Sequence, residues 1–478
     1  MSIVRLHLSE SDPMYVQSLS ILNVRGFKSV AMKLRHPDEP REEDAAGTVL
    51  HLPNITLLLG NNGSGKTTVL RAVALSTLAP ILTYGSGYVP YALVRRVRKH
   101  AARGSTATAM AILHEQDTKG KATLTALSVH LAAATGFTDR FLLRSKSSFR
   151  WTRKMYEEDS PAFFVLGYGA TRRVETGPVG TELRAKERLL RYQRVAGLFE
   201  EHITLVPLSS WLPGWQYKHR SHHREVFELI NQLLPDAELL KKSSTDGEYL
   251  FRRGGATLPY PALSDGYRAF ISWVGDLLYH LCLSCPPEMK LVDCKGIVLV
   301  DEVDLHLHPE WQRHIVPRLS QAFPNLQFIL TSHSPLVAGT LSSRNVLLLE
   351  ELTLPSGERL TAVRPPEDEL YGLSSDQILT SDSFKLESTR DEQFFERLKA
   401  AADDAREGGV NEALRFMRMV GGGAAAETPL ALNKKKRASP PPRRKPATTR
   451  VGEGLRAVAK PKNVKRVSAP RKRGGRSR

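Results

Sequence analysis

The sequence predicts an α/β fold built around a doubly wound core. Three apolar segments are typical of buried strands: ITLLLG (55–60), GIVLVDE (296–302) and LQFILTSHS (326–334). Helix-like segments lie beside them in the chain, KTTVLRAVALSTL (66–78) and PEWQRHIVPRLSQAF (309–323). Strands that alternate with helices and end in polar loops indicate this class of fold.

The other elements divide the chain into five predicted parts. Alternating residues predict strands at 19–34 and two more within 105–150, and AFFVLGYGA (162–170) and NVLLLE (345–350) are further strand candidates. Residues 180–240 have a mainly helical pattern, and an amphipathic helix occupies 261–281. We expect an N-terminal lobe (1–100), an insertion of antiparallel strands and helices (101–260), a C-terminal lobe (261–350), an extension (351–419) and a disordered basic tail (420–478).

The positive charge is concentrated at one end of the chain. The net charge of the 478 residues is +18, and residues 434–478 hold 18 Lys or Arg against one acid, Glu453. This tail is poor in large apolar residues and cannot bury enough surface to order itself. The chain has no apolar run of membrane-spanning length and no signal-peptide core. We therefore predict a cytoplasmic protein without a membrane partner, in which Cys282 and Cys285 are buried, inert thiols.

A glycine-rich segment follows the first core strand. GNNGSGKTT (60–68) fits the pattern G-x-x-x-x-G-K-[ST] between a strand and a helix, which is the context of a P-loop. We expect the loop to bind the phosphates of ATP, with Lys66 reaching the β- and γ-phosphates and Thr67 ligating Mg²⁺. The predicted ATP-binding residues here are Gly60, Asn61, Asn62, Gly63, Ser64, Gly65, Lys66, Thr67 and Thr68.

Two later strand ends supply the remaining chemistry. Asp301 ends the strand of GIVLVDEVDLHLHPE (296–310), where it would hold Mg²⁺ through water. Glu302 is placed to accept a proton from the attacking water as a general base. His333 follows the next strand and could hydrogen-bond the γ-phosphate. The predicted catalytic residues are therefore Glu302, His333 and Lys66.

The segment LSDGY (263–267) opens a helix 37 residues before Asp301. Its Ser-Asp-Gly start has two interpretations: an ordinary capped helix, or a helix end that receives an anion. It resembles the signature of ABC-type ATPases, L-S-G-G-Q. The resemblance implies a P-loop NTPase head with a mixed central sheet, an antiparallel β subdomain and a helical insertion. It also implies that Ser264, Asp265, Gly266 and Asp304 face the ATP of a second copy.

Other segments resemble particular branches of these ATPases. NVRGFKSV (23–30) is similar to the first strand of RecF and SMC-like proteins. The resemblance implies a nucleotide contact from Lys28, with Arg25 and Ser29 as further candidates; the alternative is a surface strand with incidental basic residues. SHSP is similar to OLD-type ATPases. VLGYGATRRV (165–174) and DELYGLSSDQILTSDSF (368–384) resemble ATPase subunits of antiphage systems such as Septu and retrons.

Two expected features of these ATPases are missing from the sequence. No Q-loop is recognisable, and Tyr168, Arg172 and Arg173 are the candidates for that region. The OLD proteins carry a nuclease domain with spaced carboxylates, and no such pattern follows residue 350. A DNA-cutting step would therefore need a separate nuclease partner.

Basic segments point to nucleic acid. The tail has the composition of a nucleic-acid-binding arm, although a solubilising extension or a segment that docks on an acidic partner has the same composition. The run DRFLLRSKSSFRWTRK (139–154) interleaves cations with Phe141, Phe149 and Trp151, and it could equally be a strand with a solvated face. Its candidate nucleic-acid contacts are Arg144, Lys146, Arg150, Arg153 and Lys154. A third, weaker run lies at 94–104.

These observations favour an ATP-hydrolysing ATPase that dimerises around ATP and Mg²⁺ and closes on DNA, in DNA repair or antiphage defence. The alternative is a scaffold that binds ATP without hydrolysis and regulates a nuclease or toxin partner. A transporter subunit is disfavoured because such a subunit needs the usual Q-loop to meet its membrane domain.

Overall fold

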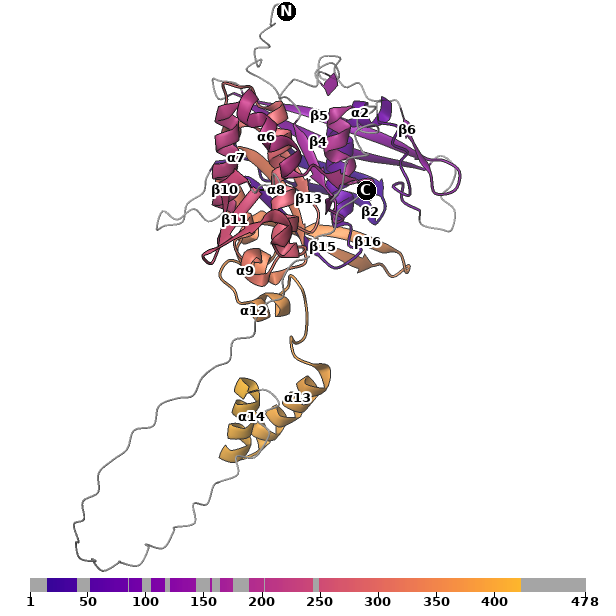
Figure 1. The fold of residues 1–478 in the computed structure, drawn as a ribbon. Coiled ribbons are helices and arrows are strands. Elements are labelled where there is room, and N and C mark those ends of the chain that lie inside the picture. Colours follow the sequence, from indigo (N-terminus) through magenta and orange to yellow (C-terminus); the bar gives the residue numbers. More distant parts are fainter. Residues whose placement is uncertain are drawn as a thin grey trace, which may run out of the picture. The chain divides into compact units, whose positions relative to one another are not determined.

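The computed structural model describes residues 15–40, 52–84, 86–96, 105–116, 121–142, 155–156, 164–174, 189–201, 203–243 and 249–422 (Figure 1). The chain forms two compact units, Met1–Phe395 and Glu396–Arg478. The first unit contains all the sheets described below, and its mixed α/β architecture around a P-loop confirms the predicted fold class.

A six-stranded sheet forms the centre of the first unit, in the order β16-β15-β3-β14-β13-β7. The strands are β3 (Ile55–Gly60), β7 (Val165–Tyr168), β13 (Gly296–Val300), β14 (Leu326–Ser332), β15 (Val346–Thr353) and β16 (Arg359–Arg364). All neighbours pair in parallel except β16, which is antiparallel to β15. Aliphatic runs suit strands that are covered on both faces, and β13 and β14 are buried along their whole length.

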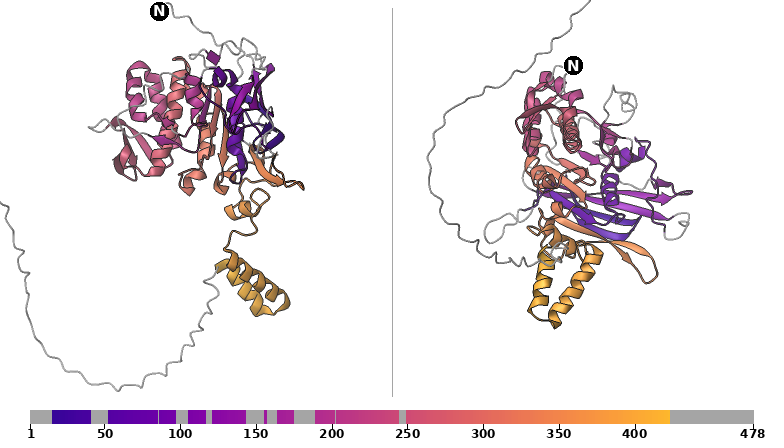
Figure 2. Two further views of the ribbon diagram at one scale, coloured as in Figure 1. Left: turned by 90° about the vertical axis from the view of Figure 1, so that its right-hand side faces the viewer. Right: turned by 60° about the horizontal axis from the view of Figure 1, so that its bottom comes forward.

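Alternate residues of these strands enter two separate hydrophobic cores. Val298 and Val300 pack into one core, with α8 (Asp265–Ser284), α7 (Arg220–Leu233) and α10 (Ile315–Ala322). Ile297 and Leu299 face the other core, with α1 (Lys66–Thr77) and α2 (Ala79–Tyr84). This two-residue alternation places the central sheet between two covering layers, as Figure 2 shows.

A five-stranded antiparallel sheet covers the core on the α1 side, in the order β2-β1-β4-β5-β6. It consists of β1 (Tyr15–Val24), β2 (Phe27–Lys33), β4 (Thr106–Gln116), β5 (Ala122–Ala133) and β6 (Asp139–Leu142). The buried amide of Gln327 on β14 connects the two sheets. It donates to the carbonyls of Val16 (2.8 Å) and Arg35 (2.6 Å), and it accepts from the Val16 N–H at 2.8 Å. The predicted antiparallel strands are present, with β6 in addition.

The opposite face carries the helical region. It contains α6 (Leu208–Lys218) and α7, but also β8 (Arg173–Val174) paired with β9 (Thr204–Leu205), whereas α5 (Leu190–Ala196) packs into the core on the α1 side. A small sheet follows, formed by β10 (Ala237–Ser243), β11 (Tyr249–Arg253) and β12 (Ala256–Pro259). Helices predominate in the described part of 180–240, as predicted, and β9 and the start of β10 occur in addition. Short helices α9 (Pro309–Gln312), α11 (Pro335–Ala338) and α12 (Ser375–Thr380) complete this unit.

The second unit begins within α13 (Glu392–Glu407) and continues with α14 (Val410–Gly422). The two helices lie side by side (Figures 1 and 2). Because α14 runs to Gly422, the predicted tail start at 420 falls inside a helix. The remainder of that predicted tail, 423–478, lies outside the described residues. The predicted lobes 1–100, 101–260 and 261–350 share the first unit with residues 351–395, and their boundaries stay predictions.

Two further predictions concern the thiols and the membrane. Cys282, Cys285 and Cys294 are all buried and free of disulfide bonds, and burial raises the pKa of the Cys282 thiol. No helix in the part of the chain that the structure describes has the length and apolar character needed to cross a bilayer.

Candidate functional site

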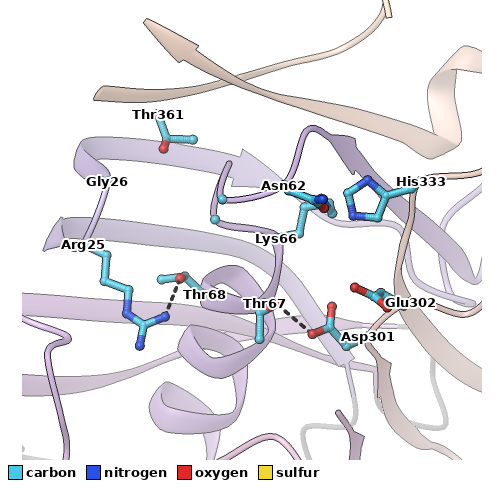
Figure 3. Close-up of a pocket in the computed structure, with 12 residues that line it drawn as sticks. Arg25, Gly26, Asn62, Lys66, Thr67, Thr68, Asp301, Glu302, His333 and Thr361 are labelled. Carbon is cyan, nitrogen blue, oxygen red and sulfur yellow. Dashed lines mark hydrogen bonds between the residues drawn. The ribbon is translucent and has the colours of Figure 1, made fainter. Parts of the chain in front are cut away.

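A cavity lies where β3, β13 and β14 end, facing the turn between β1 and β2 (Figure 3). The carboxyl ends of parallel strands are the usual place for a ligand in α/β sheets. The lining residues come from the P-loop, from both strand ends and from the antiparallel elements: Arg25, Gly26, Asn62, Gly63, Gly65, Lys66, Thr67, Thr68, Asp301, Glu302, His333 and Thr361.

The P-loop segment curls directly into the start of α1. Gly65 is the residue before this helix and has φ of 98°, and a Cβ built on it would lie 2.8 Å from the Phe27 ring. Only glycine meets both conditions without strain. No side chain caps α1, so the first amides of the helix remain available to an anion. Ser64 Oγ is also buried without a hydrogen-bond partner among the described residues.

Lys66 lies against the loop that precedes it. Its Nζ donates to the carbonyls of Gly60 (2.7 Å) and Asn61 (3.0 Å). Burial lowers the pKa of Lys66 to about 8, against the opposing effect of the nearby carboxylates, Asp301 first. A polyanion in the cavity would offset this burial and favour the ammonium form.

Asp301 is held from two sides. Thr67 Oγ1 donates to Asp301 Oδ2 at 2.7 Å, and Thr331 Oγ1 on β14 donates to Asp301 Oδ1 at 2.6 Å. Oxygen donors of this kind are what Mg²⁺ takes in proteins, so the Thr67 hydroxyl and the Asp301 carboxylate fit a magnesium ion. Within the described residues, no cluster of three or more His, Cys, Asp or Glu offers a separate metal site.

Glu302 and His333 line the same side of the cavity, opposite Arg25 (Figure 3). Glu302 has a positive φ of 48°, and its N–H donates to Thr331 Oγ1 at 2.7 Å. The pKa of His333 is lowered, first by burial and then by the charge of Lys66. A neutral imidazole is thereby favoured, which has one N–H donor and one acceptor nitrogen.

The Ser-Asp-Gly segment starts α8, as expected, but it does not line this cavity. Ser264 occupies the N-cap position and is exposed, and its side chain makes no capping hydrogen bond. Asp265 is exposed and forms an ion pair with Arg268. A Cβ on Gly266 would lie 2.8 Å from the His306 carbonyl oxygen. The close approach of His306 in the same chain therefore explains why this position is a glycine.

Asp304 follows the acidic strand end and is partly buried. Its Oδ1 atom is buried without a hydrogen-bond partner among the described residues. An unpaired carboxylate oxygen costs free energy unless a ligand or another chain satisfies it.

The first hairpin contributes Arg25 rather than Lys28. Arg25 has φ of 45° in the turn, lines the cavity, and donates to the Ala92 carbonyl (3.2 Å) and to Thr68 Oγ1 (3.5 Å). Lys28 and Ser29 are exposed on β2 and are not among the lining residues. A nucleotide contact from Lys28 therefore has no support from this geometry and stays a prediction.

Gly26 and Thr361 also line the cavity: Gly26 lies within the NVRGFKSV segment but is not one of its predicted contacts, and no sequence motif indicates Thr361. The Thr361 N–H donates to the Gly26 carbonyl at 2.9 Å, and a Cβ on Gly26 would lie 2.5 Å from Thr361 Oγ1. Thr361 comes from the antiparallel edge strand β16, which has no recognisable signal in the sequence. The alignment of that edge against the hairpin is visible only in the folded chain.

Tyr168 and Arg172 lie next to the acidic strand end. The Tyr168 hydroxyl donates to Asp276 Oδ2 on α8 at 2.8 Å. Arg172 Nη2 donates to the Asp301 carbonyl at 3.1 Å and also to the Glu302 carbonyl. The side chain of Arg173, the third candidate for this region, is outside the described part. So are the predicted nucleic-acid contacts, since residues 143–154 are not described.

Several known proteins resemble this chain over part of its length. Residues 197–339 match the family model described as "AAA domain, putative AbiEii toxin, Type IV TA system". The chain is 29% identical to the Retron Ec83 probable ATPase of Escherichia coli over 278 residues, which is 52% of this chain and 51% of that protein. It is 27% identical to the Septu protein PtuA of Bacillus mycoides over 338 residues, 70% of this chain and 41% of that protein.

The chain is related to retron and Septu defence proteins. A shorter match, 38% identical over 128 residues, joins it to the Retron Vc95 probable ATPase of Vibrio cholerae, covering 27% of this chain and 25% of that protein. The predicted resemblance to these systems is thereby confirmed. The chain spans about half or less of the length of these relatives.

Solved SMC head domains align over most of the chain but with low scores. The SMC head from Thermotoga maritima is 14% identical, with a TM-score of 0.36, and covers 74% of this chain and 100% of that chain. The SMC head bound to the C-winged helix domain of ScpA is 13% identical, with a TM-score of 0.39, and covers 74% of this chain and 98% of that chain. The P-loop and the order of the strands, rather than these alignments, identify the fold.

Proposed function

We propose that this protein hydrolyses ATP between two copies of itself and that the cycle serves antiphage defence. The observation that carries the proposal is the junction of Thr67 with Asp301 at a cavity that also contains Glu302. A P-loop hydroxyl, a metal-binding carboxylate and a second carboxylate are the parts that phosphoryl transfer to water requires. The relatives named as retron ATPases support the same reaction class.

Each residue of the site has a separate role in the proposed reaction. The loop amides and Lys66 bind the β- and γ-phosphates, and Thr67 with Asp301 would hold Mg²⁺, which neutralises charge on the phosphate oxygens. Glu302 accepts a proton from the attacking water, because its carboxylate lines the cavity. His333 donates its N–H to the γ-phosphate, which its favoured neutral form permits.

The second half of the site would come from another copy. Ser264 is exposed and its hydroxyl is not used for capping, so it is available to a phosphate of the partner. Asp304 has an unsatisfied buried oxygen on the neighbouring segment. We infer that both residues reach across an ATP-dependent dimer interface, as the resemblance to the ABC signature implies.

DNA and a nuclease are the partners that we propose for this dimer. The support for DNA is the concentration of 18 basic residues in 434–478, since such a segment binds phosphate backbones through charge. A separate nuclease is proposed because the sequence shows no spaced carboxylates of its own for DNA cleavage. DNA repair is the other process that this arrangement would serve.

The test compares Glu302→Gln, Lys66→Ala and the matched exposed control Glu310→Gln. With ATP and Mg²⁺, Glu302→Gln should accumulate as an ATP-bound dimer in light scattering, and Lys66→Ala should remain monomeric. Glu310→Gln should release phosphate over many turnovers, as the parent does. Equal oligomeric states for Glu302→Gln and Lys66→Ala would overturn the dimer mechanism. A parent that binds ATP but releases no more than one phosphate per chain would favour the scaffold instead.

A further inference from the structure

Arg172 holds the backbone of both acidic residues from behind the cavity. It follows β7, which pairs in parallel with β13, so it reaches the carboxyl end of that strand. Its Nη2 donates to the carbonyl oxygens of Asp301 and Glu302. Arg172 is not among the cavity-lining residues, so it acts on the two acids through their main chain.

The backbone that Arg172 holds is strained. Glu302 has φ of 48°, in the left-handed region that is unfavourable for a residue with a side chain. Such a conformation persists only where surrounding groups fix it. The Thr331 hydroxyl fixes the Glu302 N–H from one side, and the guanidinium fixes the Glu302 carbonyl from the other.

The same guanidinium contacts α8, the helix whose N-cap is Ser264. Its central carbon lies 6.0 Å from the ring centroid of Trp273 on α8. Tyr168, four residues before Arg172, packs its ring edge-on against Trp273 with 5.8 Å between centroids, and it donates to Asp276 on α8. Arg172 thus contacts both α8 and the turn that carries Glu302.

Arg172 remains a cation at neutral pH despite its burial. Desolvation lowers the pKa of Arg172 to about 10, and the carboxylates nearby, Asp301 first, oppose that shift. A charged donor makes stronger hydrogen bonds to carbonyl oxygens than a neutral one.

We propose that Arg172 is a positioning residue that sets the orientation of Asp301 and Glu302 and makes it depend on the position of α8. This inference rests on the proposed ATPase function. It predicts that nucleotide phosphates bind normally without Arg172, whereas metal binding at Asp301 and proton transfer at Glu302 are impaired. A change at the start of α8 would reach the acidic residues through Trp273 and Arg172.

The experiment compares Arg172→Met and Arg172→Lys with a matched control, Arg318→Met. Arg318 also donates to main-chain carbonyls, those of Gln232 and Leu233, but it does not line the cavity. Fluorescent ATP binding with and without Mg²⁺, steady-state phosphate release and thermal unfolding are measured on the full chain.

We expect Arg172→Met to lower kcat by about 10- to 100-fold, as loss of a charged hydrogen bond does. Metal-free ATP affinity should stay within about threefold of the parent, and the half-saturating Mg²⁺ concentration should rise by about fivefold or more. Arg172→Lys should recover part of kcat, because an ammonium keeps the charge and a donor. If Arg172→Met does not fold, the kcat and the half-saturating Mg²⁺ concentration of Arg172→Lys alone test the inference.

Three results would overturn the inference: an unchanged kcat and Mg²⁺ requirement in Arg172→Met, an equal loss of metal-free ATP affinity, or the same effects in Arg318→Met. The link to α8 is tested by Trp273→Phe, which should reduce kcat in the parent and have little effect in the Arg172→Met background. Additive losses would refute that link. A parent without turnover would refute the proposed hydrolysis, and the Mg²⁺ requirement for ATP binding would still decide the role of Arg172.

Discussion

The hydroxyl of Thr67 donates a 2.7 Å hydrogen bond to Asp301 across 234 residues of sequence. The strands that precede these residues, β3 and β13, are not neighbours, because β14 lies between them in the sheet. Thr331 on β14 bonds the other oxygen of Asp301, so three strand ends meet at one carboxylate. The predicted metal site is therefore formed by the order of the strands as much as by the motifs.

The first prediction concerns Thr331→Val, which removes the hydrogen bonds to Asp301 and to the Glu302 N–H without changing side-chain shape. We expect about 1–3 kcal/mol less stability and about a 10- to 100-fold lower kcat. Thr56→Val is the matched control, since Thr56 is a buried threonine on β3 that accepts from the Arg35 N–H away from the cavity. Denaturant unfolding and phosphate release measure both effects. A control that loses as much activity as Thr331→Val would contradict the assignment.

A second prediction separates two glycines of the P-loop. Ala at Gly65 meets both a φ of 98° and the Phe27 ring, whereas Ala at Gly63 meets a φ of 82° but open space. Gly65→Ala should cost about 1–2 kcal/mol for the backbone and about 1–3 kcal/mol for overpacking, and Gly63→Ala only the first amount. Urea unfolding without nucleotide compares them. Equal destabilisation of the two variants would show that the Phe27 contact relaxes freely.

Ser264→Ala distinguishes a cap from an intermolecular contact. Loss of a capping serine usually costs about 1 kcal/mol, but Ser264 makes no capping bond, so we expect a loss of less than about 0.5 kcal/mol. Ser374, which does cap α12 in a capping box, is the control and should show the usual cost. ATP-dependent dimerisation should weaken by about tenfold or more in Ser264→Ala alone. Normal dimerisation of Ser264→Ala together with reduced stability would show that Ser264 is an ordinary helix cap.

The pKa of Lys66 gives a pH prediction with a definite sign. In the free protein that pKa is lowered to about 8, and bound phosphates would raise it. ATP binding then takes up a proton above pH 8, so ATP affinity should fall as the pH rises from about 8 to 10. Titrations of ATP binding between pH 8 and 10 measure the predicted fall in affinity. Lys66→Met, which binds ATP weakly, is the control and should not show this pH dependence. A constant affinity of the parent over this range would contradict the prediction.

The same pKa affects the stability of the free protein. Between about pH 8 and 10.5 the unfolded chain binds more protons at Lys66 than the folded chain does, so this residue makes the free energy of unfolding rise with pH in that window.

Much of the site could be predicted because its motifs are local. Each motif joins a strand end to a loop, and the ends of parallel strands meet at one edge, so Lys66, Asp301 and His333 come together. Thr361 could not be found this way, since its place depends on the pairing of an edge strand. The sequence favoured Lys28 over Arg25, because the turn that decides which cation faces the cavity, with positive φ at Asn23 and Arg25, is not visible in the sequence pattern.

Arg172 shows a different limit of sequence reasoning. The sequence indicated Arg172 as a candidate for the unrecognised Q-loop region. Its hydrogen-bond partners are main-chain carbonyls, which every residue has, so no sequence pattern could indicate them. The short strands β9 and β10 within the mainly helical segment 180–240 have a related cause, because β9 depends on pairing with β8 and β10 on pairing with β11 in a hairpin.

The amide of Gln327 has a mechanical consequence for the cavity. It fixes β1, whose turn carries Arg25, to β14, whose end carries His333. The two strands that lead to opposite walls of the cavity are therefore joined near their first residues, at the end away from the cavity. In the proposed ATP cycle we expect β1 and β14 to move together, and α8, which reaches the sheet through Tyr168 and Arg172, to carry a movement of Ser264 to the acidic strand end.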